Sequence, residues 1–133
     1  MAAMPARPRL RSLVLVAALG LAAACSGDDT PSTEGLSEEA ARGAELVREN
    51  GCLSCHRTSA DRAAGPGWGG LAGSERELSD GTTVVADAEY LRRSILDPSA
   101  QIVAGFANAM PRFELSDEDV DAIVAYLESL ADG

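Results

Sequence analysis

The chain contains no lysine, and its 133 residues include only one histidine and one tryptophan. All 11 basic residues are arginines, and they face 21 aspartates and glutamates, so the formal net charge is −10. An acidic excess of this size argues against nucleic acid and against anionic membrane surfaces as partners. The acidity serves either plain solubility or the attraction of basic partners, and both interpretations stay open.

Large aromatic side chains are also scarce, with one Trp, two Tyr and two Phe in the whole chain. The length leaves room for one domain. A domain of about 90 residues with so few large side chains has a thin core of its own. We therefore expect a bulky apolar cofactor to supply much of what the fold buries.

No apolar run is long enough to span a membrane. Residues 13–24 are twelve apolar or small residues, preceded by Arg7, Arg9 and Arg11, and this is the pattern of an export signal. Twelve helical residues rise about 18 Å, which is short of the roughly 30 Å hydrocarbon core. The sequence therefore predicts a signal peptide over residues 1–24.

Cys25 follows this signal directly. Leu21-Ala22-Ala23-Ala24-Cys25 resembles a bacterial lipobox, in which the cysteine is lipidated, although Ala22-Ala23-Ala24 also fits ordinary A-x-A cleavage. Residues 25–36 are polar without periodicity and read as a flexible linker. We expect an exported, lipid-anchored protein on the cell membrane or outer membrane, facing the periplasm or the extracellular side.

The central motif is Cys52-Leu53-Ser54-Cys55-His56. Two thiols three residues apart and a following histidine are typical of one haem c attached through two thioethers. On one helical turn both sulfurs can reach one edge of the porphyrin, with His56 as the proximal iron ligand. The alternatives are a redox-active C-x-x-C motif and a zinc site. A zinc site needs about four ligands, and Cys25 is the only strong candidate beyond the two cysteines and the histidine of the motif.

The distal ligand follows by elimination. Once the predicted signal is removed, the chain keeps one histidine and one methionine, Met110, and it has no lysine. Paired histidine ligation and lysine ligation are therefore excluded within one chain. Met110, followed by Pro111 in an irregular stretch over 98–115, is the expected sixth ligand. The alternative is a core methionine with an open sixth position.

The glycine-rich stretch 63–70 is incompatible with a regular helix or strand, and it lacks a phosphate-binding motif. We expect it to lie against the haem. The carbonyl of Pro66 is the expected acceptor for the Nδ1 proton of His56. Trp68 is either a contact at the haem edge or an ordinary core residue.

Capping residues and apolar periodicity predict three helices. The first begins after Ser37 and closes at Gly51, the second covers 88–96 behind Asp87, and the last follows Ser116. An Asp-Gly turn before a β-branched run indicates a small β-hairpin near residues 78–86. The pair Arg92-Arg93 is expected on a solvated face.

Together these motifs resemble a class I cytochrome c. The resemblance rests on Gly43 and Leu46 before the cysteine motif, then Gly65-Pro66, Met110-Pro111 and a terminal helix with Tyr126. It implies an all-α fold with three to four helices around a covalently bound haem, over a domain at 37–133, and a close helix crossing at Gly43. It also implies Cys52, Cys55, His56 and Met110 as the haem ligands and attachment points.

A narrower resemblance is to the cytochrome c domain fused to subunit II of some bacterial haem-copper oxidases, here as a stand-alone lipoprotein. It is carried by Asp80-Gly81-Thr82, Tyr90-Leu91-Arg92, Ser94-Ile95-Leu96-Asp97-Pro98, Ile102-Val103 and Met110-Pro111. It implies an electron carrier, not an enzyme, whose haem cycles between Fe(II) and Fe(III) in a membrane-associated respiratory chain. The implied partners are redox proteins such as a terminal oxidase or a quinol-oxidising complex.

Two other functions stay open at this point. One is a haem-based ligand sensor or weak peroxidase with an open distal site. The other is a dedicated cytochrome subunit of a larger oxidase or dehydrogenase.

Overall fold

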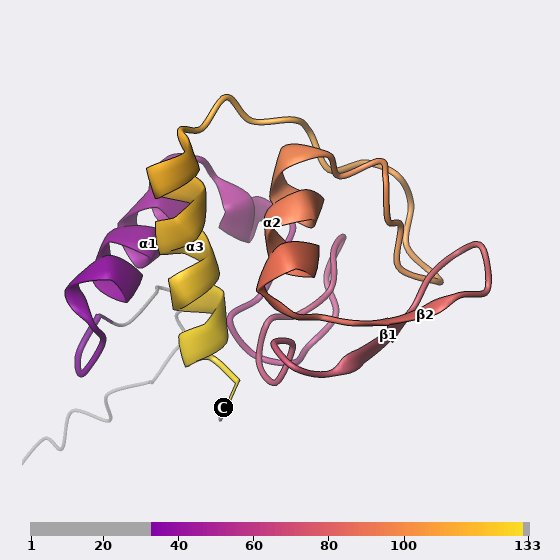
Figure 1. Cartoon of the computed structure of the whole chain (residues 1–133), viewed down its shortest axis with the longest axis horizontal. Helices are drawn as coiled ribbons and strands as arrows, with labels where there is room; N and C mark the ends of the chain where they lie inside the picture. The colour runs from indigo at the N-terminus through magenta and orange to yellow at the C-terminus, as the bar shows by residue number, and fades with distance from the viewer. Residues whose placement is uncertain (1–32, 132–133) are drawn as a thin grey trace, which may run out of the picture.

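The computed structural model describes residues 33–131, and the predicted signal peptide and Cys25 lie outside these residues. Figure 1 shows the helices, a small hairpin and long connecting loops. The elements in chain order are α1 (Glu38–Glu49), the 3-10 helix η1 (Cys52–Ser54), β1 (Glu75–Glu77), β2 (Thr83–Val85), α2 (Ala88–Leu96) and α3 (Asp117–Ser129). The expectation of a mostly helical class I cytochrome c fold is confirmed. Over residues 33–131 the structure contains no helix that is both long and apolar enough to cross a membrane.

Each α-helix begins at the capping residue that the sequence predicts. The side chains of Ser37, Asp87 and Ser116 accept hydrogen bonds from backbone amides three residues ahead, at 3.1, 2.9 and 3.2 Å. These caps satisfy amides that have no partner inside the helix, and the acidic residues that follow suit the positive end of the helix dipole. Local chemistry therefore sets where the three helices start.

α1 and α3 cross closely at Gly43, as Figure 1 shows. A Cβ atom at Gly43 would overlap the carbonyl oxygen of Ala122 and would lie 2.8 Å from Cβ of Tyr126. Tyr126 and Val47 are among the most deeply buried side chains of the described chain. The expected close crossing at Gly43 is confirmed, because only a residue without a side chain allows the two backbones to approach this far.

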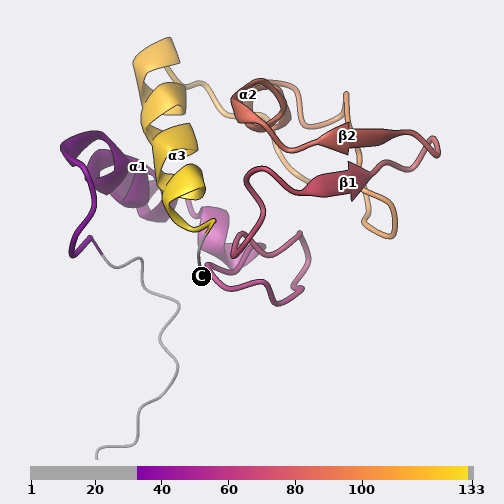
Figure 2. The ribbon, with the colours of Figure 1, turned by 60° about the horizontal axis from the view of Figure 1, so that its bottom comes forward.

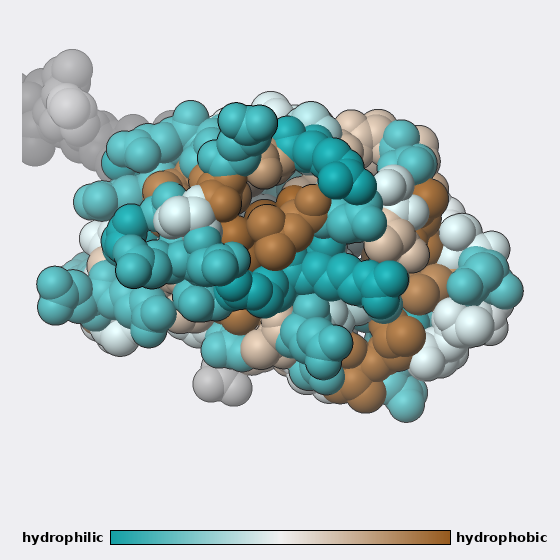
Figure 3. Space-filling view, turned by 45° about the horizontal axis from the view of Figure 1, so that its top comes forward, coloured by the Kyte–Doolittle hydropathy of each residue, from teal (hydrophilic) through white to brown (hydrophobic). Residues whose placement is uncertain are grey.

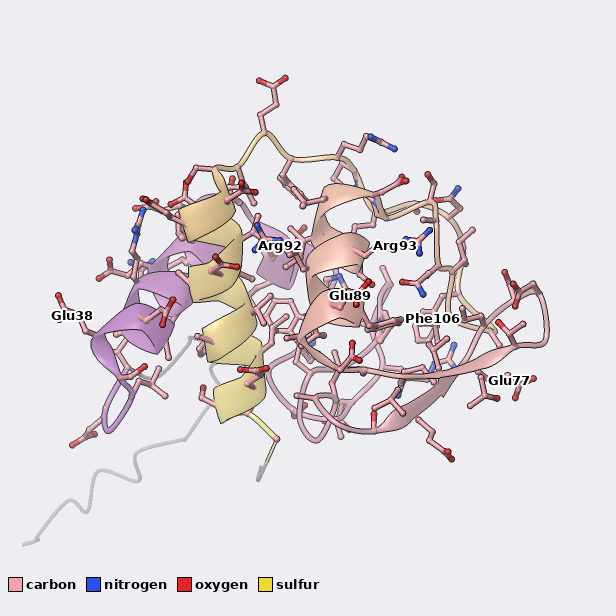
Figure 4. The ribbon with its side chains drawn as sticks, in the orientation of Figure 1. Glu38, Glu77, Glu89, Arg92, Arg93 and Phe106 are labelled. Carbon is pink, nitrogen blue, oxygen red and sulfur yellow. The ribbon has the colours of Figure 1, made fainter. Side chains whose placement is uncertain are left out.

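α2 packs on α3 through an ion-pair bridge that the sequence did not predict. Arg92 donates to Asp117 at 2.8 Å and also pairs with Asp121, both on α3. Figure 4 shows Arg92 on the side of α2 that faces α3. These ion pairs lie on the surface, in keeping with the expected solvated face, and they add a contact to α3 that the sequence did not indicate.

The hairpin is confirmed, with strands that begin three residues before the expected 78–86. Glu75 pairs with Val85 and Glu77 with Thr83, and the turn contains Gly81 at φ +85°. Figure 2 shows the hairpin leading directly into α2. The first strand starts early because the antiparallel register places Glu75–Glu77 opposite Thr83–Val85 across the turn, and Leu78 forms a separate isolated bridge with Val103.

Candidate haem site

The two cysteines and the histidine lie on a tight turn directly after α1. Gly51 adopts a left-handed conformation at φ +68°, and the amides of Cys55 and His56 both donate to the carbonyl of Cys52, at 3.2 and 3.1 Å. The expected helical turn is present as a short 3-10 helix over Cys52–Ser54. Cys52 is half-buried and Cys55 is exposed.

The imidazole of His56 is held by two neighbours from the following loop. Its Nδ1 lies 2.8 Å from the carbonyl oxygen of Pro66, and its ring stacks on Trp68 with centroids 5.0 Å apart and planes 20° apart. The contact with Pro66 is the one that the sequence predicts. It places the proton on Nδ1 and leaves Nε2 as the lone-pair nitrogen that can bind a metal.

Burial shifts the pKa values of His56 and Cys52 in opposite directions. It lowers the pKa of His56, which favours the neutral imidazole, although the Pro66 carbonyl acts in the opposite direction. Burial also raises the pKa of the Cys52 thiol. A neutral imidazole is the protonation state in which histidine ligates a metal.

The glycine-rich loop lies directly against His56, as its composition suggests. A Cβ atom at Gly65 would lie 2.5 Å from Cε1 and 2.8 Å from Nδ1 of His56. The amide of Gly65 also donates to the carbonyl of Cys55 at 2.7 Å. The missing side chain therefore leaves the space that the imidazole occupies.

Gly65→Ala tests this fit. We expect the new methyl group to displace the imidazole from Pro66, to lower stability by about 1–3 kcal/mol and to reduce the fraction of chains that carry haem. Thermal unfolding and the ratio of haem to protein measure both effects. Ala63→Ser changes the same loop without entering this contact and serves as the control; equal behaviour of the two variants would contradict the fit.

Met110 belongs to the distal segment, which we define as residues 98–115 between α2 and α3. It is half-buried and lines the same cleft as Cys52, Cys55 and His56. The structure thus brings together residues that lie more than 50 positions apart in the sequence. Pro66 and Trp68 line this cleft as well, and Trp68 is 6% exposed. Trp68 is therefore both a cleft residue and a core residue.

The cleft suits a large, flat and mostly apolar group. Its volume is about 300 Å³, and none of the residues that line it is an aspartate, glutamate, lysine or arginine. Figure 3 shows apolar side chains gathered on one face of the molecule and bordered by hydrophilic ones. Two polar atoms of the lining, Ser94 Oγ and Gln101 Oε1, are buried without a partner among the described residues. A haem fits this lining, since its ring is apolar and its propionates offer hydrogen-bond partners.

The same geometry does not suit zinc. Within residues 33–131 no three histidine, cysteine, aspartate or glutamate side chains converge closely enough to hold a metal ion. A structural zinc site needs such convergence, with four ligands at about 2.0–2.3 Å. The arrangement of Cys52, Cys55 and His56 therefore favours haem attachment.

Sequence reasoning missed three features of this site. These are the stacking of Trp68 on His56, the two unpartnered polar atoms, and a contact of Arg62 with the distal segment. All three depend on how loops return in space, and no spacing or periodicity in the sequence signals them.

The chain is similar to several known proteins. Cytochrome c oxidase subunit 2 of Alkalihalophilus pseudofirmus is 36% identical over 107 residues, which cover 73% of this chain and 30% of that protein. The chain therefore spans less than a third of that relative's length. The solved structure of cytochrome cH from Methylobacterium extorquens is similar at a TM-score of 0.49 and 26% identity, covering 68% of this chain and 97% of that one. The family model for cytochrome c matches residues 40–131, so the chain belongs to the cytochrome c family and is an electron carrier with one covalently attached haem c.

Proposed function

We propose that this protein is a lipid-tethered monohaem cytochrome c with His56 and Met110 as axial ligands, which passes single electrons within a membrane-associated respiratory chain. The observation that carries the proposal is that Cys52, Cys55, His56 and Met110 line one uncharged cleft. A bound haem supplies an iron that changes between Fe(II) and Fe(III).

Each of these side chains has a separate role. The sulfurs of Cys52 and Cys55 would hold the group covalently, and Nε2 of His56 would be available to bind its iron because Nδ1 is engaged by Pro66. The thioether of Met110 would be the second iron ligand from the protein and would raise the reduction potential. With both ligands supplied by the protein, the site would exchange electrons without binding a substrate.

The proposed location rests on the sequence before the described residues. A signal peptide at 1–24, a lipidated Cys25 and a linker over 25–36 would tether the domain to the cell membrane or the outer membrane, on the periplasmic or extracellular side. Such a linker spans about 18 Å root mean square, so the domain would stay near the membrane surface.

The proposed electron acceptor is a terminal oxidase. The matched relative is named as an oxidase subunit, and this chain corresponds to less than a third of it. The present domain would thus deliver electrons as a separate carrier, or as a dedicated subunit, to an enzyme of that kind. Its net charge of −10 would favour a partner with a basic docking surface.

Carbon monoxide tests the proposal. We expect the reduced holoprotein to bind carbon monoxide slowly and weakly in its native state, because the sulfur of Met110 has to leave the iron first. Visible spectra recorded after mixing measure the rate and the stoichiometry. Rapid and stoichiometric binding would refute axial ligation by Met110 and would favour a ligand sensor or weak peroxidase.

A further inference from the structure

The part of the distal segment that carries Met110 is held mainly at its ends. Before it, the amide of Ser79 donates to the carbonyl of Ile102 at 2.7 Å, and that of Ala104 to Glu77 at 2.9 Å. Over residues 107–111, the one backbone hydrogen bond found in the described chain is local, from Ala109 to Ala107 at 3.0 Å. No backbone hydrogen bond of the described residues therefore ties Met110 to the rest of the domain.

Arg62, in the loop that follows the cysteine motif, contacts the residues that directly precede this stretch. It belongs to the loop between His56 and Gly65, and its guanidinium donates to the carbonyl of Gly105 at 2.9 Å. The same guanidinium carbon lies 4.2 Å from the ring centroid of Phe106. Phe106, labelled in Figure 4, lines the haem cleft together with Met110.

These two contacts join the loop next to the proximal ligand to the segment that carries the distal one. A planar guanidinium can stack on an aromatic face and donate a hydrogen bond in its own plane at the same time. Gly105 adopts φ +79°, a conformation that favours glycine. The Arg62 contact is thus directed at the point where the segment turns towards Met110.

We propose that Arg62 is a positioning residue that holds Phe106 and the distal segment closed, so that Met110 stays on the iron. The proposal rests on the proposed function, in which Met110 is the sixth ligand. Loss of the Arg62 contacts would raise the fraction of molecules in which the segment has opened and Met110 has left. Ligand affinity at the iron would rise in proportion to that fraction.

Arg112 provides a matched comparison at the other end of the stretch. It pairs with Asp97, the residue that ends α2, and the two side chains are 67% and 43% exposed. This pair joins two parts of the distal side and does not reach the loop of His56. An exposed pair of this kind contributes little. Arg112→Ala therefore removes an arginine near Met110 without removing the link that we assign to Arg62.

The experiment is a titration of the oxidised, haem-loaded full chain with imidazole, which binds iron only where Met110 has left. We expect Arg62→Ala to raise the apparent affinity about tenfold, equivalent to about 1.4 kcal/mol. Arg62→Lys keeps a cation and a donor but loses the planar stacking, and we expect an intermediate increase. Arg112→Ala should change the affinity by less than about twofold.

Phe106→Leu keeps apolar bulk and removes the aromatic face, so it tests the same contact from the partner residue. We expect a smaller increase than that of Arg62→Ala, which also loses the hydrogen bond to Gly105, and a double variant that does not exceed Arg62→Ala substantially, because the stacking contact is shared. If Arg62→Ala does not accumulate with haem, the imidazole affinities of Arg62→Lys and Phe106→Leu, each compared with that of the unchanged protein, test the proposal instead.

Two results would overturn the proposal. One is an imidazole affinity of Arg62→Ala and Phe106→Leu within twofold of the unchanged protein, and the other is an equal increase in Arg112→Ala. Met110→Ala separates this failure from failure of the ligand assignment. If the unchanged protein binds imidazole as readily as Met110→Ala does, Met110 is not the ligand; if it resists imidazole and the Arg62 variants also do, only the role of Arg62 is wrong.

Discussion

Met110→Ala is expected to lower the reduction potential of the haem-loaded protein by on the order of 0.1–0.3 V, part of the roughly 0.8 V over which axial ligands set haem potentials. A thioether stabilises Fe(II) relative to Fe(III), whereas the water that would replace it favours Fe(III). The haem should remain covalently attached, because Cys52 and Cys55 are unchanged. Redox titration followed by visible absorbance measures the potential, and the ratio of haem to protein measures attachment.

Phe113→Leu is the matched control for this result. Phe113 lines the same cleft, so its replacement changes packing near the haem without removing a ligand. We expect a shift several times smaller than that of Met110→Ala. An unchanged potential in Met110→Ala, or equal shifts in the two variants, would remove Met110 from the ligand role.

Gly43→Ala is expected to lower the free energy of unfolding by about 3 kcal/mol or more, at the upper end of the range for overpacking. The added Cβ would meet the backbone of Ala122, with its carbonyl carbon at 2.6 Å, and Cβ of Tyr126. Backbone on one side and a buried aromatic residue on the other leave no flexible group that can yield. For a domain of this size the melting temperature should fall by about 12 °C or more.

Glu45→Ala tests whether this loss is specific to the helix crossing. Glu45 lies exposed on the same helix, and alanine is the better helix former, so we expect a change within about 0.5 kcal/mol. Thermal unfolding of both haem-loaded variants gives the comparison. A Gly43→Ala variant as stable as Glu45→Ala would mean that the two helices can move apart at little cost.

The sequence predicts well the parts of this fold that local chemistry determines. Ser37, Asp87 and Ser116 mark the helix starts because a cap depends on residues only a few positions away. The hairpin was placed too late because Glu75–Glu77 are poor strand formers that are extended through their pairing with Thr83–Val85. The bridge between Leu78 and Val103 could not be predicted either. A local pattern contains no information about a partner 25 residues further along the chain.

The haem site also has features that the sequence predicts and features that it does not. The cysteine motif and Pro66 could be found because their spacing reflects the chemistry of one short loop. The stacking of Trp68 on His56 could not, since an aromatic residue after a glycine-rich stretch suits a core or a cofactor contact equally. The ion pairs of Arg92 could not be predicted for a related reason, because its partners on α3 are 25 and 29 residues away.

The uncharged lining of the cleft has a consequence for the speed of electron exchange. When a centre gains or loses one unit of charge, nearby charged side chains and water must rearrange, and this reorganisation energy slows the transfer. A lining without carboxylates or guanidinium groups responds weakly to such a change, as preorganised low-dielectric sites do. The acids of the described residues lie outside that lining, so they can act on a partner's approach while adding little to the reorganisation energy at the haem.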